Sequence, residues 1–282
     1  MFPRAGKLRD VARNVKRLFF ALSLFCFAIA SHGESATDEL RAVQLLENAA
    51  ITRYKASAQA DSDRAELDKV AENYEQLVKK YPRDANVREA YGSFLWSIER
   101  RSEAFAQWET GEKLDPKDAD IAFRLGNAWV DLGDAKKATD YFSRASRLAP
   151  RDALYHFNLG NALFLFRHEM HDERTKTSDD VAQRALEEFR TATGLDPFNE
   201  DYAKAFADAF YTVPSPDWNE ALKAWEHFRD VSANKDFAYT NLARVSLKMG
   251  RKEQAREYLA RISGKQFDRI KERLTRQLDA AQ

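Results

Sequence analysis

Four turns of similar sequence recur along the chain, and their spacing constrains the fold more than any other feature. Each has a proline followed two residues later by Asp or Asn, and the prolines, Pro82, Pro116, Pro150 and Pro197, lie 34, 34 and 47 residues apart. Proline ends a helix because it lacks the backbone N–H, and Asp or Asn caps the next helix by accepting a free N–H. A period of this length indicates a repeat architecture, in which each unit buries its apolar face against its neighbours. The turns therefore predict an elongated stack of helix–turn–helix units.

Between the turns, small and large residues recur in a common register. Gly and Ala allow two helix backbones to approach closely, and a large side chain fills the adjoining gap. The repeat from Ala119 shows this register at Leu125, Gly126, Gly133, Ala138, Phe142 and Ala145. The repeat from Ala85 shows it at Gly92, Ala104, Trp108 and Gly111, and the repeat from Ala153 at Leu159, Gly160, Ala185, Phe189 and Ala192. This register resembles the tetratricopeptide repeat, a helix–turn–helix unit of 34 residues.

The resemblance implies an all-α fold, a right-handed α-solenoid of about six tetratricopeptide repeats closed by a C-terminal capping helix. We expect an N-terminal segment with the start of the first helix over residues 31–50, and the solenoid over residues 51–262. The expected repeats lie near residues 51–84, 85–118, 119–152, 153–199, 200–235 and 236–262. Residues 263–282 form the expected capping helix, because apolar residues recur on one helical face there among Arg and Lys.

The first thirty residues have the pattern of a secretory signal. Six basic residues and one acidic residue are followed by an apolar run over residues 18–30, which ends in Ala28-Ile29-Ala30. As a helix this run would span about 20 Å, less than the ~30 Å hydrocarbon core of a bilayer. We therefore predict a signal peptide over residues 1–30 and an exported, periplasmic protein. The alternative is an uncleaved anchor formed by residues 18–30, which exports the body equally. Cleavage would remove Cys26, the single cysteine, and with it any disulfide or thiolate chemistry.

The charge of the chain argues against a nucleic-acid partner. Lys and Arg balance Asp and Glu at 45 each, but the first thirty residues hold six of the basic residues and one of the acidic ones. The rest of the chain therefore carries an excess of acidic residues. Because nucleic-acid-binding proteins present a basic face, we expect no nucleic-acid partner.

One interval departs from the repeat length, and it holds the weak candidates for a metal site. The repeat over residues 153–199 contains a 13-residue insertion, whose polar part, residues 167–180, includes His168 and His171. Two His residues three apart share a helical face, but a zinc-protease helix spaces them four apart with Glu after the first. We interpret the insertion as a tolerated polar loop or helix extension and predict no metal site, with a metal-binding module through His168 and His171 as the lesser alternative. The sequence has no glycine-rich phosphate loop and no Gly-x-Ser-x-Gly elbow, so we expect no enzymatic activity and no cofactor.

The resemblance also implies where a partner binds. In tetratricopeptide stacks the first helix of each repeat lines a concave groove that holds an extended peptide or a helix. The register places these candidate groove residues there: Trp96, Phe123, Asn127, Phe157, Asn161, Phe164 and Tyr211. The alternative is that the aromatic residues pack against the neighbouring repeat and that the Asn residues are structural.

One subgroup of the family binds a C-terminal carboxylate through two Asn residues flanked by Lys and Arg. Here Asn127 and Asn158 fall at the Asn places, but Phe123 stands at the first cationic place and Asp201 and Ala205 at the later ones. We therefore predict no recognition of a carboxylate tail. The expected function is a non-enzymatic scaffold or adaptor of the cell envelope that binds a protein partner in its groove. The alternative is a structural assembly subunit that acts through its convex face or its ends.

Overall fold

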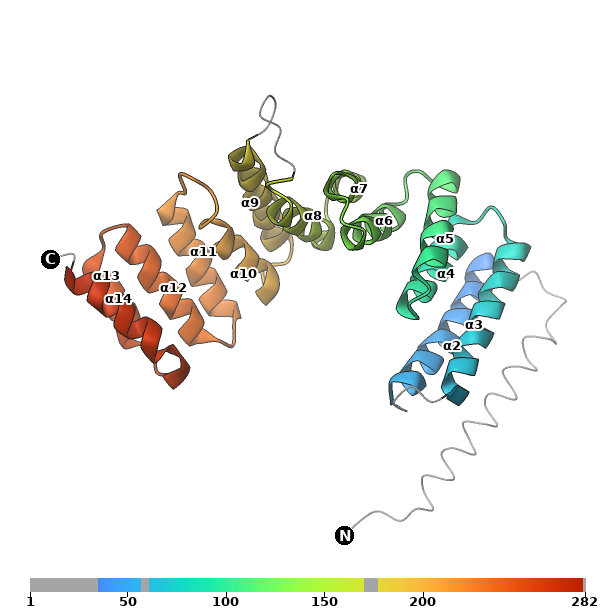
Figure 1. Cartoon of the computed structure of the whole chain (residues 1–282), viewed down its shortest axis with the longest axis horizontal. Coiled ribbons are helices and arrows are strands. Elements are labelled where there is room, and N and C mark those ends of the chain that lie inside the picture. Colours follow the sequence, from blue (N-terminus) through green and yellow to red (C-terminus); the bar gives the residue numbers. More distant parts are fainter. Residues whose placement is uncertain (1–34, 57–60, 170–176, 281–282) are drawn as a thin grey trace, which may run out of the picture. The chain divides into compact units, whose positions relative to one another are not determined.

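The computed structural model describes residues 35–56, 61–169 and 177–280, and in these residues it contains thirteen α-helices and no strand (Figure 1). The prediction of an all-α helical repeat is confirmed, with six helix pairs followed by a last helix. The chain divides into two compact units, residues 1–87 and residues 88–282. The predicted signal peptide, with Cys26 and the anchor alternative over residues 18–30, lies outside the described residues. Among the helices that are described, none is both long and apolar enough to cross a bilayer.

The first unit contains one helix pair, α2 (Ala36–Ala56) and α3 (Asp61–Lys80). Tyr74 lies fully buried between them and donates a hydrogen bond of 2.6 Å to the Glu47 carboxylate. Helix α2 starts at Ala36, within the segment over residues 31–50 that was expected to hold the start of the first helix, and it continues past residue 51.

The second unit contains five further helix pairs. They are α4 (Ala85–Ser97) with α5 (Arg101–Leu114), α6 (Ala119–Asp131) with α7 (Ala135–Leu148), α8 (Ala153–Leu165) with α9 (Ser178–Leu195), α10 (Glu200–Ala209) with α11 (Trp218–Val231), and α12 (Lys235–Lys248) with α13 (Lys252–Ala260). A short 3-10 turn, η1 (Lys265–Phe267), leads into the last helix, α14 (Asp268–Ala280), which buries Leu274 and Leu278. From α6 to α13, each second helix also packs against the first helix of the next pair.

In the turns between helix pairs, Asp and Asn cap the following helix, as the sequence predicts. Asp118 accepts a hydrogen bond from the backbone N–H of Ile121, and Asp152 accepts one from Leu154. Asn199 accepts from two backbone N–H groups at the start of α10. Each cap satisfies donors that have no partner within their own helix, so each first helix starts at a defined residue.

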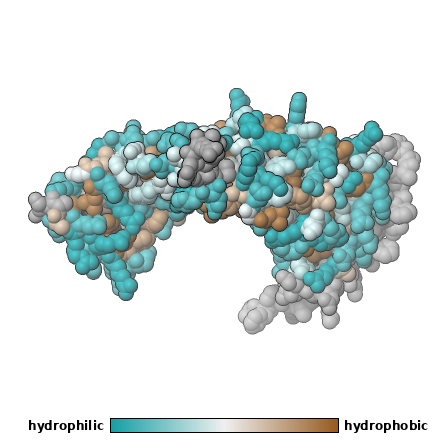
Figure 2. All heavy atoms as spheres, turned by 45° about the horizontal axis from the view of Figure 1, so that its top comes forward, coloured by the Kyte–Doolittle hydropathy of each residue, from teal (hydrophilic) through white to brown (hydrophobic). Residues whose placement is uncertain are grey.

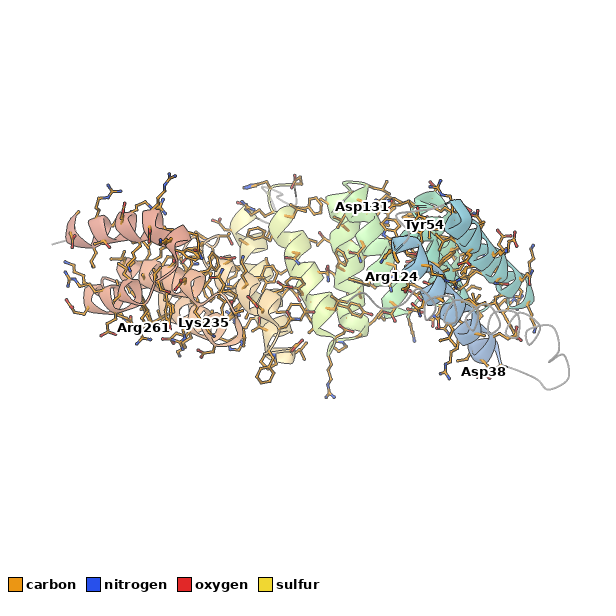
Figure 3. The ribbon with its side chains drawn as sticks, turned by 90° about the horizontal axis from the view of Figure 1, so that it is seen from below. Asp38, Tyr54, Arg124, Asp131, Lys235 and Arg261 are labelled. Atoms are coloured by element: carbon orange, nitrogen blue, oxygen red, sulfur yellow. The ribbon has the colours of Figure 1, made fainter. Side chains whose placement is uncertain are left out.

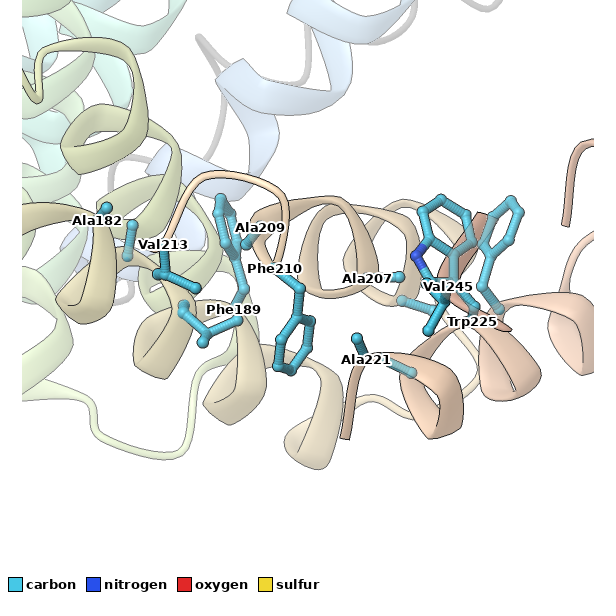
Figure 4. Packing of buried hydrophobic residues seen from close by; sticks show 14 of the residues in the cluster. Ala182, Phe189, Ala207, Ala209, Phe210, Val213, Ala221, Trp225 and Val245 are labelled. Atoms are coloured by element: carbon cyan, nitrogen blue, oxygen red, sulfur yellow. The ribbon is translucent and has the colours of Figure 1, made fainter. Parts of the chain in front are cut away.

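The small–large register produces the contact between the two helices of a pair. A Cβ atom placed on Gly126 would lie 2.7 Å from the ring of Phe142, and one on Gly160 would lie 2.8 Å from the ring of Phe189. A Cβ atom on Gly92 would lie closer still to the ring of Trp108. The same pairing of Ala with a large residue continues further along the unit, where Ala207 lies near Trp225 and Val245 (Figure 4). The predicted register therefore corresponds to real interhelical contacts.

The insertion lies between α8 and α9. Helix α8 ends at Leu165, and α9 starts at Ser178 behind a capping box formed by Thr177 and Asp180. Residues 170–176, including His171, lie outside the described part. That the insertion is tolerated remains a prediction.

Candidate functional site

The first helices of the second unit bring most of the predicted groove residues together in two hollows. We call the set of residues at the groove positions of α4, α6, α8, α10 and α12 the first-helix face; it comprises Trp96, Phe123, Asn127, Val130, Phe157, Asn161, Phe164, Lys204, Asp208, Tyr211 and Arg244. Apolar and hydrophilic side chains alternate in small patches on the surface in view (Figure 2). In each hollow, adjacent first helices contribute side chains to the same space.

The first hollow, of about 240 Å³, lies between α4 and α6. Its lining residues are Ser93, Trp96, Trp108, Arg124, Asn127, Val130 and Asp131. The charges at this hollow are paired internally. Arg124 and Asp131 lie on the same helix (Figure 3), where Arg124 binds Glu89 at 3.0 Å and Asp131 forms an ion pair with Arg101.

Trp96, the predicted groove residue of the first hollow, is partly covered. The guanidinium of Arg101 lies 4.9 Å from the ring centroid of Trp96, and the Trp96 and Trp108 rings are 5.4 Å apart. A cation over an aromatic face is itself a favourable contact. Less of the Trp96 ring is therefore accessible to a partner than the sequence register alone predicts.

Phe123 lies inside the repeat stack. It is 9% exposed, and its ring packs between Phe142 at 5.8 Å and Tyr155 at 5.2 Å. The side-chain amide of Asn127 donates to the Phe123 carbonyl at 3.2 Å, so part of its hydrogen-bonding capacity is used within its own helix. At this position the structure favours the packing alternative over direct ligand contact.

The second hollow, of about 300 Å³, lies between α8 and α10 and holds three of the predicted groove residues. It is lined by Phe157, Asn161, Phe164, Phe189, Asp201, Lys204, Ala205, Asp208 and Ala209. Phe157 is partly buried, with ring contacts to Tyr202 at 4.6 Å and Phe189 at 6.0 Å, and its remaining edge lines the hollow. Lys204 and Asp208 form an ion pair of 2.6 Å at the rim. The side-chain amide of Asn161 makes no hydrogen bond to any described residue, so it is free to bind a ligand.

Tyr211 continues this surface toward α12. It is 38% exposed, its hydroxyl donates to Oδ1 of Asn241 at 3.4 Å, and Arg244 donates to the same oxygen at 3.0 Å. Partial burial raises the pKa of the Tyr211 phenol to about 12, so the hydroxyl stays protonated and remains a donor at physiological pH.

Several lining residues were missed by the groove register. Arg124 and Asp131 follow groove positions by one residue, and Trp108 and Phe189 belong to second helices. The register marks one stripe along each first helix. It carries no information on side chains that reach the same space from the edge of that stripe or from the paired helix.

Among the histidines of the described residues, His156 has a structural role. His156 places Nδ1 2.7 Å from the Glu188 carboxylate and Nε2 3.2 Å from the Pro150 carbonyl, so it joins α8, α9 and the preceding turn. His168 lies exposed after α8. Within residues 35–56, 61–169 and 177–280, no three His, Cys, Asp or Glu side chains gather as a metal site. His171, the other candidate metal ligand, lies outside this part of the chain.

Comparison with known families gives two matches, both to models of the tetratricopeptide repeat. One covers residues 38–164 and the other residues 238–262. No curated protein matches the chain in sequence.

Solved structures share the fold at low identity. YrrB, described as a TPR protein with an unusual peptide-binding site, is 18% identical, with a TM-score of 0.60 over 73% of this chain and 99% of YrrB. PilF of Pseudomonas aeruginosa is 14% identical, with a TM-score of 0.52 over 85% of this chain and 99% of PilF. A MamA structure is 17% identical, with a TM-score of 0.50 over 62% of this chain and 88% of MamA. Identities this low establish the fold alone.

Proposed function

Since the chain is a tetratricopeptide repeat protein, whose fold is a scaffold for protein–protein interaction, we propose that it is an adaptor that holds a peptide or helix of another protein on its first-helix face. The observation that carries this proposal is the second hollow. Its apolar walls are Phe157, Phe164 and Phe189, and the free amide of Asn161 lies among them. Apolar pockets with a few polar groups are where binding energy concentrates in interfaces. That YrrB is described as having a peptide-binding site supports a peptide as the occupant.

The proposal assigns no catalytic role and no cofactor to the chain. The charged side chains at the two hollows, such as Arg124 and Lys204, are held in ion pairs with Glu89 and Asp208. Charged side chains of this kind would orient a bound segment, and the exposed edges of the aromatic rings would supply the apolar area that the segment buries.

Blocking the second hollow tests the proposal. Ala205 lies on α10 and lines the hollow, so Ala205→Trp fills the space that a partner side chain would enter. We expect at least a tenfold loss of partner recovered by cross-linking and co-purification from native envelopes, with a thermal midpoint within a few degrees of wild type, since roughly 1.4 kcal/mol corresponds to a factor of ten.

The matched control also tests the alternative function. Ala106 is exposed on α5, a second helix, so Ala106→Trp adds the same bulk to another surface. Retention of the partner by the Ala106 variant is expected. If the Ala106 variant lost the partner and the Ala205 variant kept it, a structural assembly subunit acting through its convex face would replace the adaptor.

The proposed place of action is the periplasm, reached by export through the signal peptide over residues 1–30. The basic flank, the short apolar run and Ala28-Ile29-Ala30 support this route. Intact-mass measurement of the protein from its native host should give a chain that begins near Ser31. A full-length mass in the membrane fraction would favour the anchor formed by residues 18–30, and a full-length mass in the cytosol would contradict export.

A further inference from the structure

The cations on the first-helix face and directly beside it differ in their partners. Arg124 has the Glu89 carboxylate at 3.0 Å, and Lys204 has the Asp208 carboxylate at 2.6 Å. Arg244 has an amide oxygen instead, Oδ1 of Asn241 at 3.0 Å, and it forms no ion pair with any carboxylate of the described residues. A guanidinium has five N–H donors in a planar fork, so most of its donors remain available.

Arg244 is also held in position. Asn241 is 1% exposed, and its side-chain amide donates to the Phe237 carbonyl at 3.1 Å, which fixes the direction of Oδ1. That oxygen accepts from both Tyr211 and Arg244. Arg244 itself is partly buried. A charged group that is partly removed from water and held by a rigid neighbour gains more from an opposite charge than a mobile surface cation does.

The second hollow and Arg244 are neighbours on consecutive first helices. Tyr211 links them, because its backbone N–H donates to the carbonyl of Asp208, which lines the hollow, and its hydroxyl shares Oδ1 of Asn241 with Arg244. Helices α10 and α12 both pack against α11, helices in such contacts lie roughly 10 Å apart, and an extended peptide rises about 3.3 Å per residue. A bound segment would cross from one to the other in about three residues.

The second hollow and the position of Arg244 carry opposite charges. Asp201, Asp208 and Lys204 line the hollow, and Lys204 is paired with Asp208, whereas Arg244 forms no ion pair with a carboxylate of the described residues. An acidic residue of a partner would therefore be repelled at the hollow and attracted at Arg244, which orients the segment.

We propose, resting on the adaptor function above, that this face recognises a peptide segment with a large apolar side chain for the second hollow and an internal Asp or Glu about three residues away for Arg244. The guanidinium forms a bidentate pair with that side-chain carboxylate, and Phe157 and Phe164 enclose the apolar residue. Binding thus depends on the spacing of two residue types.

Peptide selection with the full chain tests this pattern. Twelve-residue random peptides displayed on phage are selected against the immobilised full chain, and the enriched sequences are synthesised with both ends capped. We expect them to carry an aromatic or large aliphatic residue with Asp or Glu about three positions away. For one such peptide, Arg244→Gln should weaken binding roughly tenfold or more, as expected for charge-assisted hydrogen bonds, and Arg244→Lys should restore part of the loss.

A mutant cycle and a matched control decide the outcome. Changing the peptide Glu to Gln should weaken wild-type binding to a similar degree and have little further effect on the Arg244→Gln variant. Arg147 is exposed on α7, and Arg147→Gln should leave binding unchanged.

Other results of the peptide selection would contradict one or both of the proposals. The enriched peptides could lack an acidic residue, and their binding could be blocked by Ala205→Trp but not by Arg244→Gln. That result would overturn the recognition of a carboxylate and leave the adaptor function intact. If binding required a free C-terminus of the peptide, the carboxylate bound by Arg244 would be the terminal one, which would contradict an internal Asp or Glu. If no peptide were enriched, or if none were blocked by Ala205→Trp, both proposals would fail.

Discussion

Gly126→Ala should lower the free energy of unfolding by about 2–3 kcal/mol, although alanine is the better helix former. The added Cβ would lie 2.7 Å from the ring of Phe142, which is 2% exposed and has no free space to move into. The two helices must separate or the ring must leave its rotamer, and either response loses packing. Chemical denaturation of the full chain, followed by circular dichroism, measures the effect.

Gly194 provides the matched control, because it is a helical glycine of the same unit with nothing within 4 Å of an added Cβ. Gly194→Ala should stabilise the protein by roughly 0.5–1 kcal/mol through helix propensity alone. Adding Phe142→Leu to Gly126→Ala should recover part of the lost stability because it relieves the contact. Equal effects of alanine at the two glycines would contradict the account of close packing.

The Gly126–Phe142 contact shows what the sequence predicts well. Its two residues lie on different helices, yet the register identified both, because a close helix approach needs a small residue opposite a large one in every repeat. The same holds for Gly160 with Phe189. Less predictable is the turn inside each pair. Gly133 adopts φ 73°, as glycine does readily, whereas Glu99 occupies the same place 34 residues earlier with φ 64°, which no residue preference indicates.

The site was predicted less completely than the fold. The register placed Phe157, Asn161 and Phe164 on a shared surface, and the second hollow contains all three. It could not foresee that Arg101 lies over Trp96, because that contact comes from the neighbouring helix and depends on side-chain conformation. Nor could it show that Arg244 has no carboxylate partner within the described part of the chain, since that requires knowing the charged groups around it. Periodicity sets which face a residue occupies, whereas exposure and charge pairing depend on the neighbours.

Phe123→Ala should lower the free energy of unfolding by about 3–4 kcal/mol and the thermal midpoint by roughly 10 °C. The ring fills the space between Phe142 of its own pair and Tyr155 of the next, so its removal leaves a cavity between two repeats. Because each repeat is stabilised mainly by its neighbours, a gap at this junction weakens both. Loss of a partner by this variant would follow from unfolding and would not identify a binding contact.

Phe198 separates this packing effect from the general loss of an aromatic side chain. It is 85% exposed in the turn before α10, so Phe198→Ala should change stability by no more than about 0.5 kcal/mol. A thermal melt of the two variants beside wild type gives the comparison. If Phe123→Ala melted like Phe198→Ala while partner binding was lost, Phe123 would be a ligand contact after all. The expected result, a large shift for Phe123 and almost none for Phe198, assigns Phe123 to the contact between repeats.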